Sequence, residues 1–156
     1  MHAAAFPMHD LQSEVSYDPW TAYGNSKFAN LLFTYELNHR LEVSGNPKAI
    51  KAIAVHPGYT ATNLQTDRFP LYDFFNSLLA MHGEDGAKSQ VYAAVDPKVQ
   101  ASDRTYIGPA WIMFGAPKVQ STKSSAWVKE RQEKLWQESE RLTGMQFVLG
   151  GGSEQL

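Results

Sequence analysis

Residues 22–33 read AYGNSKFANLLF and lie early in an apolar segment that predicts one long helix, from residue 19 to about residue 43. Asp18 followed by Pro19 is typical of a helix start, because an aspartate can cap the first turn and a proline fits the first helical position. Gly45 should end the helix. The apolar side chains cover more than one face, which indicates a helix buried on two sides.

Two side chains near the start of this helix could carry chemistry. Tyr23 and Lys27 are four positions apart, so a helix places the phenol and the ammonium on the same face. A neighbouring positive charge stabilises a phenolate, which suits a group that gives and takes protons. The same spacing also fits an aromatic anchor beside a solvated lysine, and spacing alone leaves this alternative open.

A short apolar run follows the helix. Residues 49–55 come after a glycine and a proline and include β-branched side chains, which predicts a buried parallel strand. His56 closes the run, and we expect it either beside a ligand or simply buried. In open α/β sheets ligands bind beyond the carboxyl ends of the strands, so the residues after His56 are a candidate binding site.

These candidate binding residues are Pro57, Gly58, Thr60 and Thr62. Pro57 has no amide hydrogen and Gly58 has no side chain, so the backbone could approach a flat ring closely. Thr60 and Thr62 could offer hydroxyls or amides to a carboxamide or a phosphate. A plain strand-to-loop turn is the alternative interpretation.

The order of the two motifs resembles a known family. Tyr23 and Lys27 on a helix, then a strand and His56-Pro57-Gly58, resemble the second half of a short-chain dehydrogenase/reductase, most closely of the retinol-dehydrogenase-like branch. The resemblance extends from about residue 10 to residue 144. It implies that Tyr23 is the catalytic acid/base and that Lys27 holds the nicotinamide ribose and tunes Tyr23.

The resemblance also implies a cofactor and a fold. Pro57, Gly58, Thr60 and Thr62, together with Lys27, would bind NAD(P), with NADP the favoured form. The family begins with a strand, a glycine-rich turn and a helix that hold the pyrophosphate, and no such segment precedes the tyrosine here. We therefore expect an α/β chain that forms the C-terminal part of a Rossmann-type doubly wound parallel sheet, without the N-terminal nucleotide-binding strands.

The remaining segments complete the expected domain. Residues 1–149 would form one portion of a single dehydrogenase domain, and residues 150–156 a flexible tail. Residues 63–81 are aromatic and would form the family's substrate lid or a core helix. Residues 84–95 predict a helix, and residues 105–109 the last short strand. A charged helix over residues 123–143, capped by Gly144, should turn these side chains to the core: Trp127, Val128, Leu135, Trp136 and Leu142.

Composition excludes several classes of protein. The chain has 156 residues, 43% of them hydrophobic, which is typical of a globular domain. A net charge of −2, with both signs interspersed, gives no nucleic-acid footprint and predicts no nucleic-acid partner. The absence of cysteine fits a cytoplasmic protein and excludes thiolate metal sites, and we predict no metal. No apolar run is long enough for a transmembrane segment.

These observations lead to one functional prediction and one alternative. The resemblance implies an NAD(P)-dependent oxidoreductase that acts on a small-molecule alcohol or carbonyl substrate, with the aromatic lid favouring a lipophilic one. We expect the chain as it stands to be truncated and inactive alone. The alternative is a non-enzymatic half-domain that pairs with a full-length relative. Either a homodimer or such a pairing would use the helix over residues 19–43.

Overall fold

The computed structural model describes residues 6–44, 50–58, 83–97, 99, 105–111, 114–122 and 124–148. The described residues form two compact units. The helical unit contains α1 (Pro19–Val43), the 3-10 turn η2 (Ser124–Trp127) and α4 (Lys129–Thr143). The sheet unit contains β1 (Ala54–Val55), α3 (Gly83–Val95), β2 (Tyr106–Pro109) and β3 (Pro117–Gln120). The predicted α/β class is confirmed at this level.

The long helix α1 has the predicted bounds. Its first turn is capped by Asp18, whose Oδ1 accepts a hydrogen bond from the backbone N–H of Thr21 at 2.8 Å, and Pro19 takes the first helical position. At the other end the N–H of Ser44 donates to the carbonyl oxygen of Arg40. Gly45, the predicted stop, lies outside the described residues.

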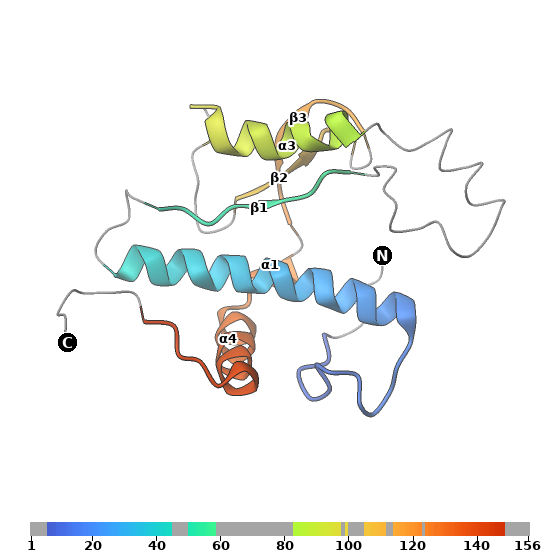
Figure 1. Ribbon diagram of the computed structural model, residues 1–156, viewed down its shortest axis with the longest axis vertical. Coiled ribbons are helices and arrows are strands. Elements are labelled where there is room, and N and C mark those ends of the chain that lie inside the picture. Colours follow the sequence, from blue (N-terminus) through green and yellow to red (C-terminus); the bar gives the residue numbers. More distant parts are fainter. Residues whose placement is uncertain are drawn as a thin grey trace. The chain divides into compact units, whose positions relative to one another are not determined.

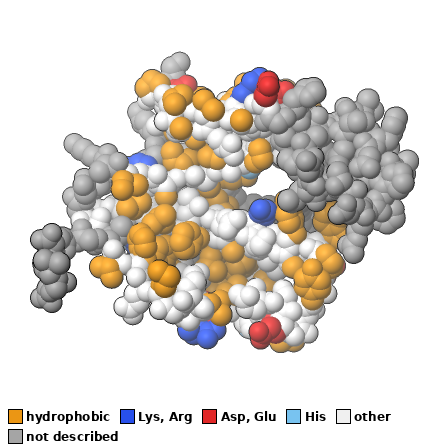
Figure 2. All heavy atoms as spheres, in the orientation of Figure 1, with side chains coloured by type: hydrophobic (Ala, Val, Ile, Leu, Met, Phe, Trp, Pro, Cys, Tyr) orange, Lys and Arg blue, Asp and Glu red, His pale blue; other side chains and the backbone are white. Residues whose placement is uncertain are grey.

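The buried side chains of α1 lie in its second half only. Leu32, Tyr35 and Leu41 are buried there, whereas Trp20 near the start of the helix is 76% exposed. The predicted burial on two sides is therefore wrong for the first half of α1. Figure 2 shows hydrophobic side chains exposed over much of the face that it draws.

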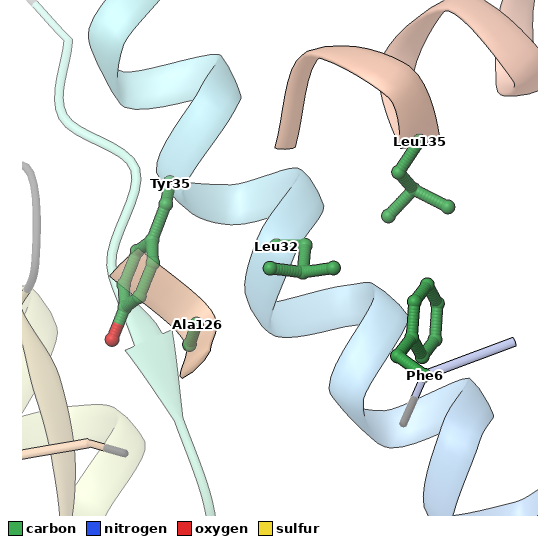
Figure 3. Close-up of a cluster of buried hydrophobic side chains, with 5 residues drawn as sticks. All are labelled: Phe6, Leu32, Tyr35, Ala126 and Leu135. Carbon is green, nitrogen blue, oxygen red and sulfur yellow. The ribbon is translucent and has the colours of Figure 1, made fainter. Parts of the chain in front are cut away.

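The core of the helical unit forms where α1, α4, η2 and the N-terminal loop meet. Figure 1 shows α4 beside α1. In the close-up, Leu32 of α1 lies between Phe6 of the loop and Ala126 of η2, with Leu135 of α4 facing Phe6 (Figure 3). The hydroxyl of Tyr35 hydrogen-bonds the Thr122 hydroxyl at 2.8 Å. This bond satisfies a buried polar group that would otherwise oppose packing.

A stack of flat groups joins α1 to α4. The ring of Trp136 on α4 lies parallel to Phe33 of α1, with centroids 4.8 Å apart and an interplanar angle of 14°. The guanidinium of Arg40 lies 4.5 Å from the Trp136 ring and pairs with the buried carboxylate of Glu36 at 2.7 Å. Cation–aromatic contacts and charge-assisted hydrogen bonds hold these planar groups in one orientation.

The sheet is small and mixed. β1 pairs with β2 in parallel, with Ala54 opposite Tyr106, and β2 pairs with β3 in antiparallel order. The parallel pairing of β1 is as predicted, but the strand is only two residues long and half-buried, not a buried strand over residues 49–55. Within the described residues β1 is an edge strand, which pairs on one side with β2, and this explains its incomplete burial.

Two further expectations are corrected. β2 is not the last strand, because the chain turns back after Ala110 and Trp111 into β3, with Gly115 at a φ of 108° and the N–H of Ala110 donating to the carbonyl oxygen of Ala116. The helix predicted from residue 123 is divided, because Val128 is extended between η2 and α4. Leu135 and Trp136 are buried as expected, whereas Leu142 is 46% exposed and Val128 is also exposed.

Helix ends elsewhere agree with the sequence. α3 begins at Gly83 and ends at Val95, directly before Asp96 and Pro97, close to the prediction. Gly144 caps α4 with a φ of 68°, a conformation that glycine adopts easily. The predicted lid over residues 63–81 and the predicted tail lie outside the described residues. None of the described helices is both long and apolar enough to span a lipid bilayer.

Candidate active site

The first half of α1 brings Tyr23 and Lys27 together. The ammonium of Lys27 lies 5.4 Å from the centroid of the Tyr23 ring, so the two side chains share a face of the helix as expected. The cation faces the aromatic ring, an attractive arrangement in its own right. Tyr23 is 53% exposed, and its phenol is therefore accessible to a molecule from solution.

Gly24 and Ser26 lie close to Tyr23 along the helix. Gly24 follows directly, and a Cβ atom placed there would meet nothing within 4 Å. The hydroxyl of Ser26 is turned back onto the helix, where it donates to the carbonyl oxygen of Tyr23 at 2.8 Å. The proton of the Ser26 hydroxyl is therefore used in a hydrogen bond within the helix.

In the sheet unit the chain turns sharply after β1. The backbone N–H of His56 donates to the carbonyl oxygen of Ile107 at 2.9 Å, which extends the β1–β2 ladder by one residue. Pro57 is exposed, and Gly58 has a φ of 82°, a conformation that costs little for glycine and more for other residues. Thr60 and Thr62, the other predicted binding residues, lie outside the described residues.

His56 is half-buried and packs within the sheet unit. Its ring stacks on the ring of Tyr106, with centroids 5.2 Å apart and an interplanar angle of 13°. Its Nδ1 accepts a hydrogen bond from the Gly58 N–H at 3.2 Å. Burial lowers the pKa of His56 below its ordinary value of 6.5, and a hydrogen bond with the Gln120 side chain opposes this shift only in part.

The predicted site residues are thus divided between the units. Tyr23 and Lys27 lie in the helical unit, and Pro57 and Gly58 lie in the sheet unit. Tyr23 and Lys27 share a face of α1, as their spacing predicted, and the binding role of Pro57 and Gly58 stays a prediction. Sequence reasoning missed the residues around His56, namely Gly108 and Gln120. A glycine inside a predicted strand can mark a close approach of another group, and that signal was available at Gly108.

A separate groove lies in the helical unit. Its volume is about 540 Å³, and Glu36, Arg40, Gln137 and Phe147 are among the residues that line it. None of the predicted catalytic or cofactor-binding residues lines this groove.

Comparison with known proteins finds relatives that are named as dehydrogenases. No family model matches the chain. It is 29% identical over 148 residues to human retinol dehydrogenase 12 and 31% identical over 142 residues to human retinol dehydrogenase 14. It is 34% identical over 144 residues to the polyprenol dehydrogenase of Danio rerio. These alignments cover 94%, 87% and 88% of this chain.

The chain matches only part of each relative. It spans 43%, 39% and 41% of the length of these three curated proteins, in the same order. Among solved structures, an uncharacterised protein from Mycobacterium paratuberculosis superposes with a TM-score of 0.71 at 34% identity. That superposition covers 92% of this chain and 47% of the other.

Proposed function

The chain is homologous to retinol and polyprenol dehydrogenases, short-chain dehydrogenases/reductases, and on this premise we propose that it is the catalytic part of an NAD(P)-dependent oxidoreductase. The substrate would be an alcohol or the corresponding carbonyl compound. The observation that carries the proposal is the exposed Tyr23 side chain, with the Lys27 ammonium 5.4 Å from the centroid of its ring. This pair lies in a chain whose relatives are retinol and polyprenol dehydrogenases. The names of the relatives favour a lipophilic alcohol.

The proposed proton transfer occurs at the Tyr23 hydroxyl. In the reducing direction the phenol donates its proton to the substrate oxygen, and in the oxidising direction the phenolate accepts the proton of the alcohol. Lys27 presents its positive charge on the same face of the helix, 5.4 Å from the centroid of the Tyr23 ring.

The described residues fit a nicotinamide cofactor. Pro57 has no N–H and Gly58 has no side chain, so a flat ring could approach the backbone closely at Gly58. The Lys27 ammonium is exposed and has three N–H donors, which suit the hydroxyls of a ribose. When bound, the nicotinamide would supply or accept the hydride. Thr60 and Thr62 are further proposed cofactor contacts, and NADP is the proposed form.

We also propose that the chain supplies the C-terminal part of a doubly wound parallel sheet. The parallel pairing of β1 with β2 and the partial coverage of the two human retinol dehydrogenases support this arrangement. On this proposal the chain needs the strands that bind pyrophosphate, and the 156-residue chain alone would be inactive. A cytoplasmic location is proposed from the absence of cysteine.

A second candidate is a half-domain without catalysis that pairs with a full-length relative or with itself. The exposed apolar side chains of α1, among them Trp20 and Val43, favour it. Co-purification of the chain with a tagged relative would support the pairing. A chain that stays monomeric at high concentration and ignores its relatives would count against it.

The catalytic proposal is tested by a chimera. The matching segment of the Danio rerio polyprenol dehydrogenase is replaced by this chain, and hydride transfer is followed at 340 nm with a polyprenal and NADPH or NADH. Tyr23→Phe keeps the ring and its contact with Lys27 but removes the hydroxyl. We expect it to lower kcat roughly 10²- to 10⁴-fold, the range for a lost general acid.

A matched control separates loss of chemistry from loss of folding. Tyr17 is exposed in the loop before α1, and Tyr17→Phe removes the same atom from a residue with no proposed role. It should leave kcat unchanged. Equal activity of the Tyr23→Phe and Tyr17→Phe chimeras would show that Tyr23 is not the acid/base and would refute the proposed mechanism.

A further inference from the structure

The ring of His56 is held from several sides at the end of β1. It stacks on Tyr106, and Gly108 lies so close that a Cβ atom on Gly108 would be 1.9 Å from Nε2 of the imidazole. Tyr106 and Gly108 are two positions apart in β2 and therefore lie on the same face of the strand. The glycine is what leaves room for the imidazole on that face.

The His56 ring has two hydrogen-bond partners, the Gly58 amide and the Gln120 side chain. Nδ1 accepts from the Gly58 N–H at 3.2 Å. The Gln120 side chain donates its NH₂ group to the carbonyl oxygen of Pro109, which leaves its oxygen to accept a hydrogen bond from Nε2–H of His56. These partners assign the proton of the neutral ring to Nε2. Burial lowers the pKa of the imidazole and so favours this neutral form near pH 7.

The hydrogen bond to Nδ1 provides an acceptor for a backbone N–H group in the turn after β1. The N–H of His56 completes the ladder to Ile107, and Pro57 has no N–H. The next donor along the chain is the N–H of Gly58, and the His56 side chain accepts it. This resembles the turns in which a side chain accepts from the backbone two residues on. The turn is therefore tied to the strand at both of its ends.

We propose that His56 is a positioning residue, whose neutral Nε2–H tautomer holds the Gly58 amide through Nδ1 and thereby fixes the Pro57–Gly58 turn for cofactor binding. The significance for cofactor binding rests on the proposed function, whereas the hydrogen bond itself does not. Gly108 and Gln120 support this role, because one leaves space for the ring and the other selects its tautomer.

Two variants of the full 156-residue chain distinguish the role of Nδ1 of His56 from that of Nε2. His56→Asn places an oxygen near the position of Nδ1 and can still accept from Gly58. His56→Gln places its oxygen near Nε2 and leaves the Gly58 amide without its acceptor. We expect amide hydrogen exchange of Gly58, measured by NMR, to be roughly 5- to 10-fold faster in His56→Gln, as for one lost hydrogen bond. In His56→Asn it should stay near the wild-type rate.

The wild-type chain provides a readout that needs no variant. The ¹⁵N chemical shifts of the imidazole report which nitrogen carries the proton, and we expect protonation at Nε2. A proton on Nδ1 would overturn the proposal even if both variants failed to fold. Equal Gly58 exchange rates in folded His56→Asn and His56→Gln would also overturn it.

Cofactor binding is measured separately in the chimera with the Danio rerio polyprenol dehydrogenase, which supplies the strands that bind pyrophosphate, by titrating it and its two His56 variants with NADPH. We expect His56→Gln to weaken binding by about the factor seen in exchange, and His56→Asn to restore it. Tighter or equal binding by His56→Gln would overturn the role in cofactor binding. If the exchange rates behave as expected and the chimera with His56 in place does not bind NADPH, the hydrogen bond stands and the proposed cofactor site fails.

Discussion

Replacing Gly108 by alanine should destabilise the sheet unit strongly for so small a change. The new Cβ atom would lie 1.9 Å from Nε2 of His56, whereas ordinary van der Waals contact begins at 3.4 Å. The imidazole would have to retreat by well over an ångström. Because its ring is stacked on Tyr106 and bonded to Gly58, this retreat breaks contacts on both sides.

The expected magnitude follows from these two losses. Inserting a methyl group into a packed site typically costs about 1–3 kcal/mol, and a lost hydrogen bond costs about 1 kcal/mol more. We therefore expect Gly108→Ala to lower the free energy of unfolding by about 2–4 kcal/mol. Urea denaturation followed by far-UV circular dichroism measures this, and faster exchange of the His56 amide would localise the damage to the β1–β2 ladder.

Gly24→Ala is the matched control, because it is the same substitution at a glycine with open space around it. Gly24 lies inside α1, where alanine is favoured over glycine by about 0.5–1 kcal/mol, so this variant should be slightly more stable. A second control is the double variant with His56→Ala, which removes the ring that the new methyl group meets. Gly108→Ala should then cost less than about 1 kcal/mol. The same cost with and without the imidazole would refute the reasoning.

Three further predictions concern the core and the pH dependence. Leu32→Ala, at a fully buried position of α1, should cost about 2–5 kcal/mol in urea denaturation, whereas Val43→Ala, 72% exposed, should change stability by less than about 0.5 kcal/mol. Tyr35→Phe should cost about 1 kcal/mol through the lost bond to Thr122, and a neutral result would show that this bond contributes nothing net. Burial lowers the pKa of His56 below 6.5 in the folded chain, so the unfolded chain takes up the proton first, and stability should fall as the pH falls below about 6.5. His56→Asn should remove this part of the pH dependence, and identical profiles for the two chains would contradict the assignment.

Local signals predicted the helices well. Asp18, Pro19 and the apolar segment after them gave the bounds of α1, because capping and proline geometry act within a few residues. The same holds for Gly144 at the end of α4. Burial was harder to predict, because it depends on which distant segments cover a face. Leu142 follows the helical pattern of α4 and is nevertheless exposed.

The sheet shows the same division between local and distant causes. Residues 117–120 read PKVQ, with one β-branched residue and a proline. This pattern is too weak to predict a strand, so β3 was not expected from the sequence. β3 forms because the chain turns back onto β2, where the N–H of Ala110 donates to the carbonyl oxygen of Ala116. For the candidate site, the Tyr23–Lys27 proximity followed from helical spacing. The role of Gly108 required the position of His56, which is set by pairing between distant strands.

The order of the three strands has a consequence for how the sheet unit folds. β2 and β3 are joined by a short turn, so their hairpin closes a small loop and can form within about 1–10 μs. β1 joins β2 only when residues roughly 50 apart in sequence meet, which costs more chain entropy and is slower. We therefore expect β1 to add last during folding and to detach first during unfolding. The Pro57–Gly58 turn, which directly follows β1, would form and disappear with that late step.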